Sequence, residues 1–314
     1  MKKVLVLYYS QTGQLTEVVK SFAAALEADE NVELVYQAIA PKKAFPFPWG
    51  KLEFFDIFPE SVYMDGCELK EFDKVNENDD FDLVILAYTI WFLSPSLPIS
   101  GFLNSKYAKL LENKPVITLI ACRNMWIMAQ EKMKKKLIEL NATLIDNVVL
   151  TDQGGNFATF LTTPRWMWTG RKNAFWGLPK SGVHPDEIKG AARFGKALVS
   201  ALANDLEKEK TPLLHGLEAV KVDNRLVGTE KIATKSFNIW GGLIRKVGTT
   251  GDKVRIPVLA LYFVFLLSLI VIVVPLNTLI KPIFRKLNHK KVDKERRYFE
   301  EPSGSSSERL KEYA

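Results

Sequence analysis

The stretch VLVLYYSQTGQLTEVVKSFAAAL, residues 4–26, contains three patterns in succession. Residues 4–9 are continuously apolar, which is typical of a strand buried on both faces of a parallel sheet. A polar turn occupies residues 10–14. Apolar residues then recur at helical spacing at Leu15, Val18, Val19, Phe22, Ala23 and Leu26. Strand, turn and helix in this order open a βαβ unit, so the stretch predicts an α/β fold.

The alternation continues downstream. Further strands are predicted over residues 32–37, 83–87, 116–121 and 143–150, and helices over residues 98–111, 125–140 and 185–205. Five strands alternating with helices predict a doubly wound parallel sheet. Ligands bind such sheets outside the carboxyl ends of the strands, so the loops after Tyr9, Ala87, Ala121 and Leu150 are the candidate site.

The composition excludes several classes of protein. The 314 residues are 47% hydrophobic and 25% charged, which is ordinary for a globular chain. Cys67 and Cys122 do not form a disulfide framework, so a reducing compartment is the simpler expectation. With only three histidines in addition, we expect no metal site.

Charge is distributed unevenly along the chain. Residues 1–240 hold equal numbers of acidic and basic side chains, whereas residues 241–297 hold 12 Lys and Arg against 3 Asp and Glu. This basic excess flanks an apolar run, so a lipid bilayer is expected as a partner and nucleic acid is not. Residues 256–274 carry no charge, about the length that a membrane helix needs. A buried core helix is the alternative.

The predicted organisation has four parts. Residues 1–210 form the α/β domain, 211–255 a linker, 256–284 a hydrophobic membrane segment and 285–314 a basic, then disordered, tail. Within the linker, residues 237–246 form either an interfacial helix or a solvated connection. A single span and a re-entrant helix bent at Pro275 and Pro282 both remain open. Two aromatic, proline-containing stretches, 41–67 and 156–181, are too long for simple connections and are expected to be lids or interaction surfaces.

The first turn has the chemistry of a phosphate site. Ser10, Thr12, Gly13 and Thr16 stand between a strand and a helix, where hydroxyl and backbone N–H groups can surround an anion. Neither a dinucleotide-binding glycine fingerprint nor a nucleoside triphosphate loop occurs. An ordinary capped turn is the alternative.

The loop after the third strand reads YTIWFLSPSLPISGFL, residues 88–103. Trp91 is positioned to stack on a planar ring, and the backbone of residues 89–93 to bond its edge. Simple burial of Trp91 and Phe92 is the alternative.

These two loops resemble those of flavodoxins and flavodoxin-like quinone reductases. The resemblance covers about residues 1–205 and implies a five-stranded sheet in the order 2-1-3-4-5. It also implies FMN, with NADPH as a candidate reductant. The implied phosphate contacts are Ser10, Gln11, Thr12, Gly13, Gln14 and Leu15, and the implied ring contacts are Thr89, Ile90, Trp91 and Phe92. Arg123 and Asn124 belong to a third loop, which departs from the glycine-rich form common in that family.

A closer resemblance comes from FPFPW at residues 45–49, TTPRWMWTG at residues 162–170 and the hydrophobic C-terminal segment. Together these are similar to the dialkylresorcinol condensing enzymes of flexirubin-type pigment pathways. This implies a bacterial membrane-associated enzyme, an amphiphilic substrate and a ketosynthase partner. Because the N-terminus shows no signal peptide, the α/β domain is expected on the cytoplasmic side of the inner membrane. Neither cysteine has a recognisable histidine partner for condensation. We therefore interpret the chain as a flavoenzyme that oxidises a cyclohexanedione-type ring to the resorcinol.

Tyr88, Arg123 and His184 are the candidates for catalytic roles. Arg123 suits stabilisation of an enolate, with a surface ion pair as the alternative, and His184 is either a base or a neighbour of a helix cap. Arg165, Trp166, Trp168, Arg171 and Lys172 either cover the substrate or contact lipid headgroups. A quinone reductase, an electron-transfer flavodoxin and a flavin-free membrane scaffold are the alternative functions.

Overall fold

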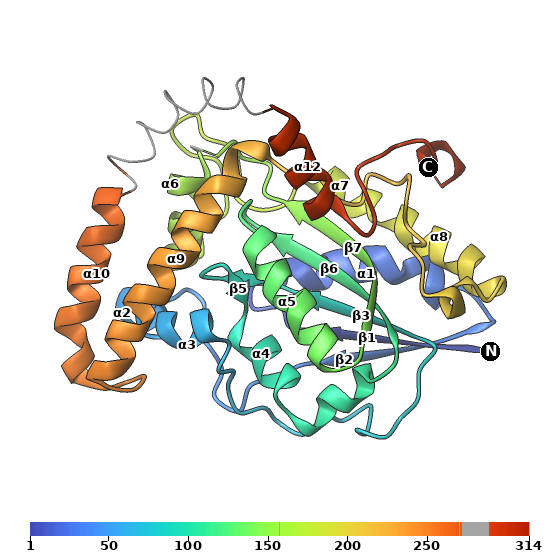
Figure 1. The fold of residues 1–314 in the computed structure, drawn as a ribbon, viewed down its shortest axis with the longest axis horizontal. Helices are drawn as coiled ribbons and strands as arrows, with labels where there is room; N and C mark the ends of the chain where they lie inside the picture. Colours follow the sequence, from blue (N-terminus) through green and yellow to red (C-terminus); the bar gives the residue numbers. More distant parts are fainter. Residues whose placement is uncertain (157, 270, 272–288, 314) are drawn as a thin grey trace.

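The computed structural model describes residues 1–156, 158–269, 271 and 289–313 (Figure 1). Its centre is a five-stranded parallel sheet in the order β2-β1-β3-β6-β7. The strands are β1 (Lys2–Tyr8), β2 (Val32–Ala38), β3 (Leu83–Tyr88), β6 (Pro115–Cys122) and β7 (Thr143–Thr151). Both the five predicted strands and their predicted order are confirmed.

Helices cover both faces of the sheet, which explains why its central strands are apolar throughout. On one face lie α1 (Gln14–Glu27), α7 (Pro185–Gly190) and α8 (Ala192–Ala203), and on the other α4 (Leu97–Leu103) and α5 (Ile127–Glu139) (Figure 1). All six residues of β3 are buried between these layers. The predicted helix over 98–111 is divided into α4 and a 3-10 helix at Lys106–Leu111.

The two long aromatic stretches contain short elements of their own. The first carries α2 (Lys51–Asp56) and α3 (Phe58–Tyr63), and the second carries α6 (Thr159–Thr169). After β3, the strands β4 (Ile90–Trp91) and β5 (Ser94–Pro95) form a small antiparallel hairpin. These elements gather at the carboxyl edge of the sheet.

The predicted linker is largely helical. Helix α9 (Asn224–Val247) and helix α10 (Ile256–Ser268) run side by side at one end of the molecule, and we call them the α9–α10 hairpin (Figure 1). The Arg255 side chain at its turn is fully buried. Its guanidinium pairs with Asp56 at 3.4 Å and with Glu60 at 3.1 Å. These ion pairs join the hairpin to α2 and α3.

The predicted membrane helix is wrong. Helix α10 has 13 residues, so it is about 20 Å long against a hydrocarbon core of about 30 Å. Among the helices that the structure describes, none combines the length and the apolar character needed to cross a bilayer. One side of α10 is instead packed, since Leu259 and Tyr262 are buried against the domain. The remainder of the predicted segment, from residue 272 to 284, lies outside the described residues.

The C-terminal segment differs from the disordered tail expected from its serine and glycine content. Helix α12 (His289–Glu300) is followed by a stretch that packs against the outer edge of β7. Buried Ser303 donates to Asp146 Oδ1 at 2.6 Å and accepts from the Asn147 N–H at 2.7 Å. A short polar side chain with two buried partners can order a segment whose composition alone is typical of disorder.

Helices α1 and α8 approach each other closely at Gly195, where an added Cβ would lie 2.1 Å from the Phe22 carbonyl oxygen. We expect Gly195→Ala to lower the free energy of unfolding by about 3 kcal/mol or more, because the backbone of α1 must move. Gly228 in α9 is the matched control, since an added Cβ there meets no atom within 4 Å. Gly228→Ala should raise stability by about 0.5–1 kcal/mol. Urea denaturation measures both, and equal effects would contradict the close packing.

Candidate functional site

The loop after β1 leaves the first turn of α1 open. Gly13 is the N-terminal flanking residue of α1, has a φ of 83° and provides no side-chain cap. No atom lies within 4 Å of the position that a Cβ on Gly13 would occupy. Ser10 Oγ accepts from the Thr16 N–H at 3.3 Å. The earlier N–H groups of such a turn have no acceptor within the helix, so they can bind an anion.

Gln11 connects this loop to the first aromatic stretch. Its amide nitrogen donates to the Pro46 carbonyl at 2.8 Å, and the Trp49 indole donates to its amide oxygen at 3.2 Å. The backbone N–H of Trp49 donates to the Met167 carbonyl of α6 at 2.8 Å. The loop after β1, the first aromatic stretch and α6 are therefore joined, and the Gln11 side chain makes two of the connecting hydrogen bonds.

Lys172 brings a positive charge to the first turn of α1. With the Gln14 amide oxygen directed toward Lys172, that oxygen accepts from the ammonium group at 3.2 Å and from the Val183 N–H at 3.2 Å. The Lys172 ammonium also lies 5.3 Å from the centre of the Trp166 ring. Sequence analysis assigned Lys172 to a lid or to lipid, and its contact with Gln14 at the start of α1 was missed. No local sequence signal joins residues 158 positions apart.

The hairpin after β3 turns through two strained residues. Phe92 and Leu93 have φ values of 49° and 57°, and bulky side chains rarely adopt this left-handed conformation. Such strain persists only where the surroundings impose it, and it is frequent at binding sites. The turn positions Trp91 at the carboxyl edge of the sheet.

Trp91 is only 7% exposed and lies within a cluster of aromatic rings. Edge contacts reach it from Tyr9, Phe45 and Trp49, with ring centres 5.9, 5.1 and 5.5 Å away. The burial weighed as an alternative for Trp91 is therefore observed. The stacking of its indole on a flat ligand stays a prediction.

Unpaired polar atoms converge on the same edge. Thr89 Oγ1 after β3 and Asn124 Oδ1 after β6 are buried and have no hydrogen-bond partner among the described residues. The same holds on α6 for Thr162 Oγ1, Thr163 Oγ1 and Trp168 Nε1. Because buried polar atoms are normally paired, these atoms indicate hydrogen-bonding capacity that a polar ligand can use.

Arg123 and Asn124, both predicted site residues, are tied to the segment around α6. Arg123 Nε donates to Thr159 Oγ1 at 2.9 Å, and its guanidinium lies 4.1 Å from the centre of the Phe160 ring. Burial lowers the pKa of Arg123 to about 10, which still leaves it cationic at neutral pH. Asn124 donates to Asn156 Oδ1 at 2.7 Å.

Asp152, just beyond β7, was missed by sequence analysis. Its N–H donates to the carbonyls of Cys122 and Arg123 at 3.0 and 2.9 Å, which joins the third loop to the fourth. Its carboxylate accepts from the Gly154 and Gly182 N–H groups. Burial raises the pKa of Asp152, while these bonds and Arg123 oppose the rise. Its position directly after a predicted strand was the available signal.

Two predicted catalytic residues lie apart from this group. Tyr88 is fully buried and donates its hydroxyl to Gln130 within the core, and burial holds its pKa well above the usual value. His184 flanks α7, where its Nδ1 accepts from the Asp186 N–H at 3.2 Å. These positions favour a core role for Tyr88 and the helix-cap role already considered for His184.

The cysteines are not activated as nucleophiles. Burial raises the pKa of Cys67 to about 11 and that of Cys122 further, so both thiols stay protonated at neutral pH. Among the charged groups that shift the Cys122 pKa, Glu230 and Asp152 also raise it. This agrees with the redox interpretation and disfavours thiolate chemistry.

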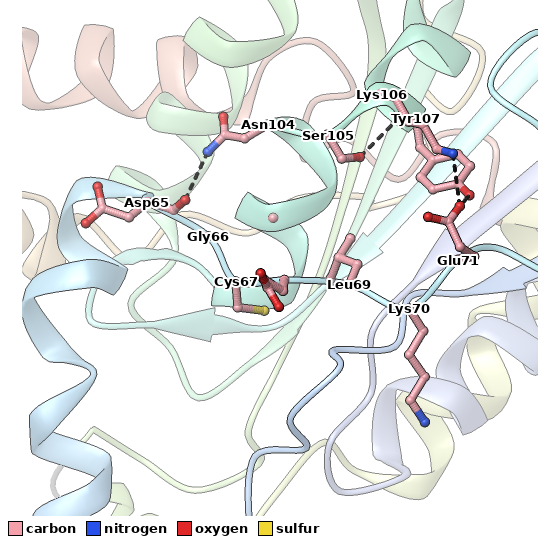
Figure 2. Close-up of a pocket in the computed structure, with 12 residues that line it drawn as sticks. Asp65, Gly66, Cys67, Leu69, Lys70, Glu71, Asn104, Ser105, Lys106 and Tyr107 are labelled. Carbon is pink, nitrogen blue, oxygen red and sulfur yellow. Dashed lines mark hydrogen bonds and ion pairs between the residues drawn. The ribbon is translucent and has the colours of Figure 1, made fainter. Parts of the chain in front are cut away.

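A hollow of about 610 Å³ lies away from these loops, between residues 65–71 and the end of α4 (Figure 2). Its polar groups are largely paired with one another: Tyr107 donates to Glu71, and Asn104 donates to the Met64 carbonyl at 3.0 Å. It contains none of the predicted site residues. A Cβ on Gly66 would lie 2.6 Å from Gly101, so this region is a close backbone contact.

No protein-family model and no curated protein matches the chain. Among solved structures, it is similar to a flavoprotein from Lactobacillus acidophilus NCFM in complex with FMN, with 18% identity over 48% of this chain and 93% of that one and a TM-score of 0.38. It is also similar to a flavodoxin-like WrbA-like protein from Agrobacterium tumefaciens, with 10% identity over 65% of this chain and 98% of that one and a TM-score of 0.37. A flavodoxin from the domain Archaea has 10% identity, covers 64% of this chain and 99% of its own, and has a TM-score of 0.35.

The unpaired Thr89 hydroxyl permits a sharp test. Thr89→Val keeps the side-chain shape and removes a buried hydroxyl that has no partner, so we expect stability without ligand to be unchanged or about 1 kcal/mol higher. If a ligand bonds this hydroxyl, FMN affinity should fall about tenfold. Denaturation and flavin titration measure the two effects.

Thr118→Val is the control. Thr118 Oγ1 is already bonded to Asn147 and Gln130 at 3.0 and 2.9 Å, so its loss should cost about 1–3 kcal/mol of stability and leave FMN affinity unchanged. Equal stability losses in the two variants would argue that Thr89 is an ordinary core residue.

Proposed function

We propose that this chain binds FMN across the loops after β1, β3 and β6 and uses it to oxidise an amphiphilic ring substrate. The observation that carries the proposal is the combination, at the carboxyl edge of the sheet, of the first turn of α1, where Gly13 provides no side-chain cap, with the buried, unpaired polar atoms of Thr89 and Asn124. In doubly wound sheets of this strand order, ligands bind at this edge.

The phosphate of FMN fits the first turn of α1. Backbone N–H groups of residues 12–15 and the helix dipole favour an anion there, and Gly13 permits close approach. Leu15 contributes only its backbone, since its side chain is in the core. Lys172 adds a cation beside Gln14. Unlike the hydroxyl and backbone groups, this cation distinguishes a phosphate from a neutral sugar.

The ring of FMN fits between the second and third loops. Thr89 and Asn124 offer hydrogen-bonding atoms there, and Arg123 supplies a fixed positive charge. The first aromatic stretch and α6 cover this region through Trp49 and Met167. Such a cover suits a reaction that excludes water, and it disfavours a bare electron carrier, whose flavin edge must reach a partner.

The finer part of the proposal concerns the reaction. Converting a dialkyl cyclohexanedione to a dialkylresorcinol removes one hydride and one proton from the ring, and FMN, when bound, supplies the hydride acceptor. Arg123 stabilises the enolate oxygen of the dione through its charge. Asp152, held beside the third loop by its N–H bonds to the Cys122 and Arg123 carbonyls, is the candidate group to receive the proton, and burial raises the pKa of its carboxyl above the usual value.

This proposal keeps a ketosynthase as the source of the ring, which derives from the sequence resemblance. It also keeps the cytoplasmic side of a bacterial inner membrane as the location of the enzyme. Because oxidation of the ring leaves FMN reduced, an electron acceptor must reoxidise it, so NADPH as a reductant of the cofactor belongs to the alternative quinone reductase.

The phosphate contact is tested with two flavins that differ only in the phosphate. We expect Lys172→Met to weaken FMN binding about tenfold and to leave riboflavin binding unchanged, because only the charge at the phosphate is lost. Lys180→Met, at an exposed lysine of the same segment, should change neither. Titration by quenching of flavin emission measures both affinities. Equal weakening of FMN and riboflavin would contradict the assigned position of the phosphate.

The reaction is tested on FMN-loaded protein without oxygen. A dialkyl cyclohexane-1,3-dione should bleach the flavin absorption in one turnover and yield the resorcinol, which mass spectrometry detects as a loss of two hydrogens. Asp152→Asn should slow bleaching roughly 100-fold or more while FMN remains bound. Bleaching by NADPH followed by reoxidation with a quinone, without any effect of the dione, would replace this proposal with a general quinone reductase.

A further inference from the structure

The outer side of α10 is an apolar surface with no described partner. Along its 13 residues α10 carries no charged side chain. Its inner side packs on the domain, whereas Leu261 and Val264 on its outer side are 60% and 59% exposed. The exposed apolar side chains on the hairpin are Ile256, Leu261, Val264 and Leu267 of α10 and Ile232, Ile239, Leu243 and Val247 of α9. Contiguous exposed apolar surface of this kind indicates an interaction site.

The charge of the α9–α10 hairpin favours an anionic lipid surface as the partner of this apolar face. Residues 224–268 hold seven basic side chains and two acidic ones, Glu230 and Asp252, and Glu230 is buried. Arg255 is buried in its ion pairs, so the turn presents Lys246 and Lys253 to solvent. An apolar helix beside exposed lysines is complementary to a bilayer with anionic headgroups. A second copy of the chain is disfavoured, because a symmetric contact would bring two basic hairpins together.

We propose that the α9–α10 hairpin docks on an anionic lipid surface, with α10 lying in the plane of the interface and its outer side inserted among the acyl chains. The helix lies on the bilayer and does not cross it, in keeping with the packing of Leu259 and Tyr262 on the domain. The ion pairs of Arg255 with Asp56 and Glu60 hold the α/β domain against the inserted helix.

A chain of aromatic ring contacts connects the inner side of α10 to the candidate site. Tyr262 of α10 stacks on Phe58 with ring centres 4.3 Å apart, and Phe58 contacts Phe92 at 5.0 Å. Phe92 follows Trp91 directly in the strained turn. The docked hairpin thus places an apolar layer between the bilayer and the site, which suits a substrate with alkyl chains. Docking itself does not depend on the proposed reaction.

Flotation of the full-length protein with vesicles tests the docking. Wild-type protein should float with phosphatidylcholine vesicles that contain phosphatidylglycerol, and less with phosphatidylcholine alone. The double substitution Leu261→Asp with Val264→Asp should weaken partition roughly 100-fold, because two inserted apolar side chains become charged. Circular dichroism and FMN titration check that the fold is retained.

Ile138→Asp is the matched control, since Ile138 is a 73% exposed apolar residue on the distant helix α5. It should float as wild type does. Lys246→Glu with Lys253→Glu should remove the preference for anionic vesicles. Failure of wild-type protein to float, or equal flotation of the α10 variant and the control, would overturn the proposal. A dimer that the α10 substitutions dissociate, without vesicle binding, would assign the surface to a second copy instead.

Discussion

The first turn of α1 presents N–H groups that the helix cannot satisfy, and the arrangement of the carboxyl edge follows from this. Gly13 adopts a left-handed conformation and offers no cap, so an acceptor must come from outside the helix. The surrounding loops are consistent with such an acceptor being a ligand: Gln11 is bonded to the aromatic cover, and Lys172 reaches Gln14 from the far end of the second aromatic stretch. Contacts at the start of α1 thereby join the loop after β1 to both aromatic stretches, which are distant from it in sequence.

Much of the fold could be predicted because its signals are local. A continuous apolar run such as that of β3 indicates a strand buried on both faces. The apolar run, polar turn and helical spacing of residues 4–26 indicate a strand followed by a helix, as β1 and α1 are. Of the site, the loops were predicted from their positions after strands, whereas residues 10–15, 89–92 and 123–124 were named from the family resemblance, and their contacts with a ligand stay predictions. In a doubly wound sheet these loops lie together at the carboxyl edge, where ligands bind.

What sequence could not supply depends on contacts between distant residues. The position of Tyr88 in the core depends on Gln130 of α5, whose side-chain oxygen accepts a hydrogen bond from the Tyr88 hydroxyl. The order of the tail depends on Ser303 meeting Asp146. In the same way, α10 has the composition of a membrane span, and only its packing through Tyr262 and the ion pairs of Arg255 show a short surface helix. Composition reports the environment that a segment needs, and it does not report which partner provides it.

The proposed membrane contact and the proposed redox chemistry are separable in this molecule. The hairpin and the candidate site are joined by the rings of Tyr262, Phe58 and Phe92, yet each has its own physical basis, apolar surface in one case and unpaired polar atoms in the other. Loss of docking is therefore expected to leave flavin binding intact. For a substrate held in a bilayer, the two properties act together by bringing the ring to the edge of the sheet.

The most direct test of the account is a crystal structure of the protein reconstituted with FMN. The account predicts the phosphate at the first turn of α1, within hydrogen-bond distance of the N–H groups of residues 12–15, and the ring beside Thr89 and Asn124. A flavin bound elsewhere, such as in the hollow between residues 65–71 and α4, or a protein that takes up no flavin, would contradict it.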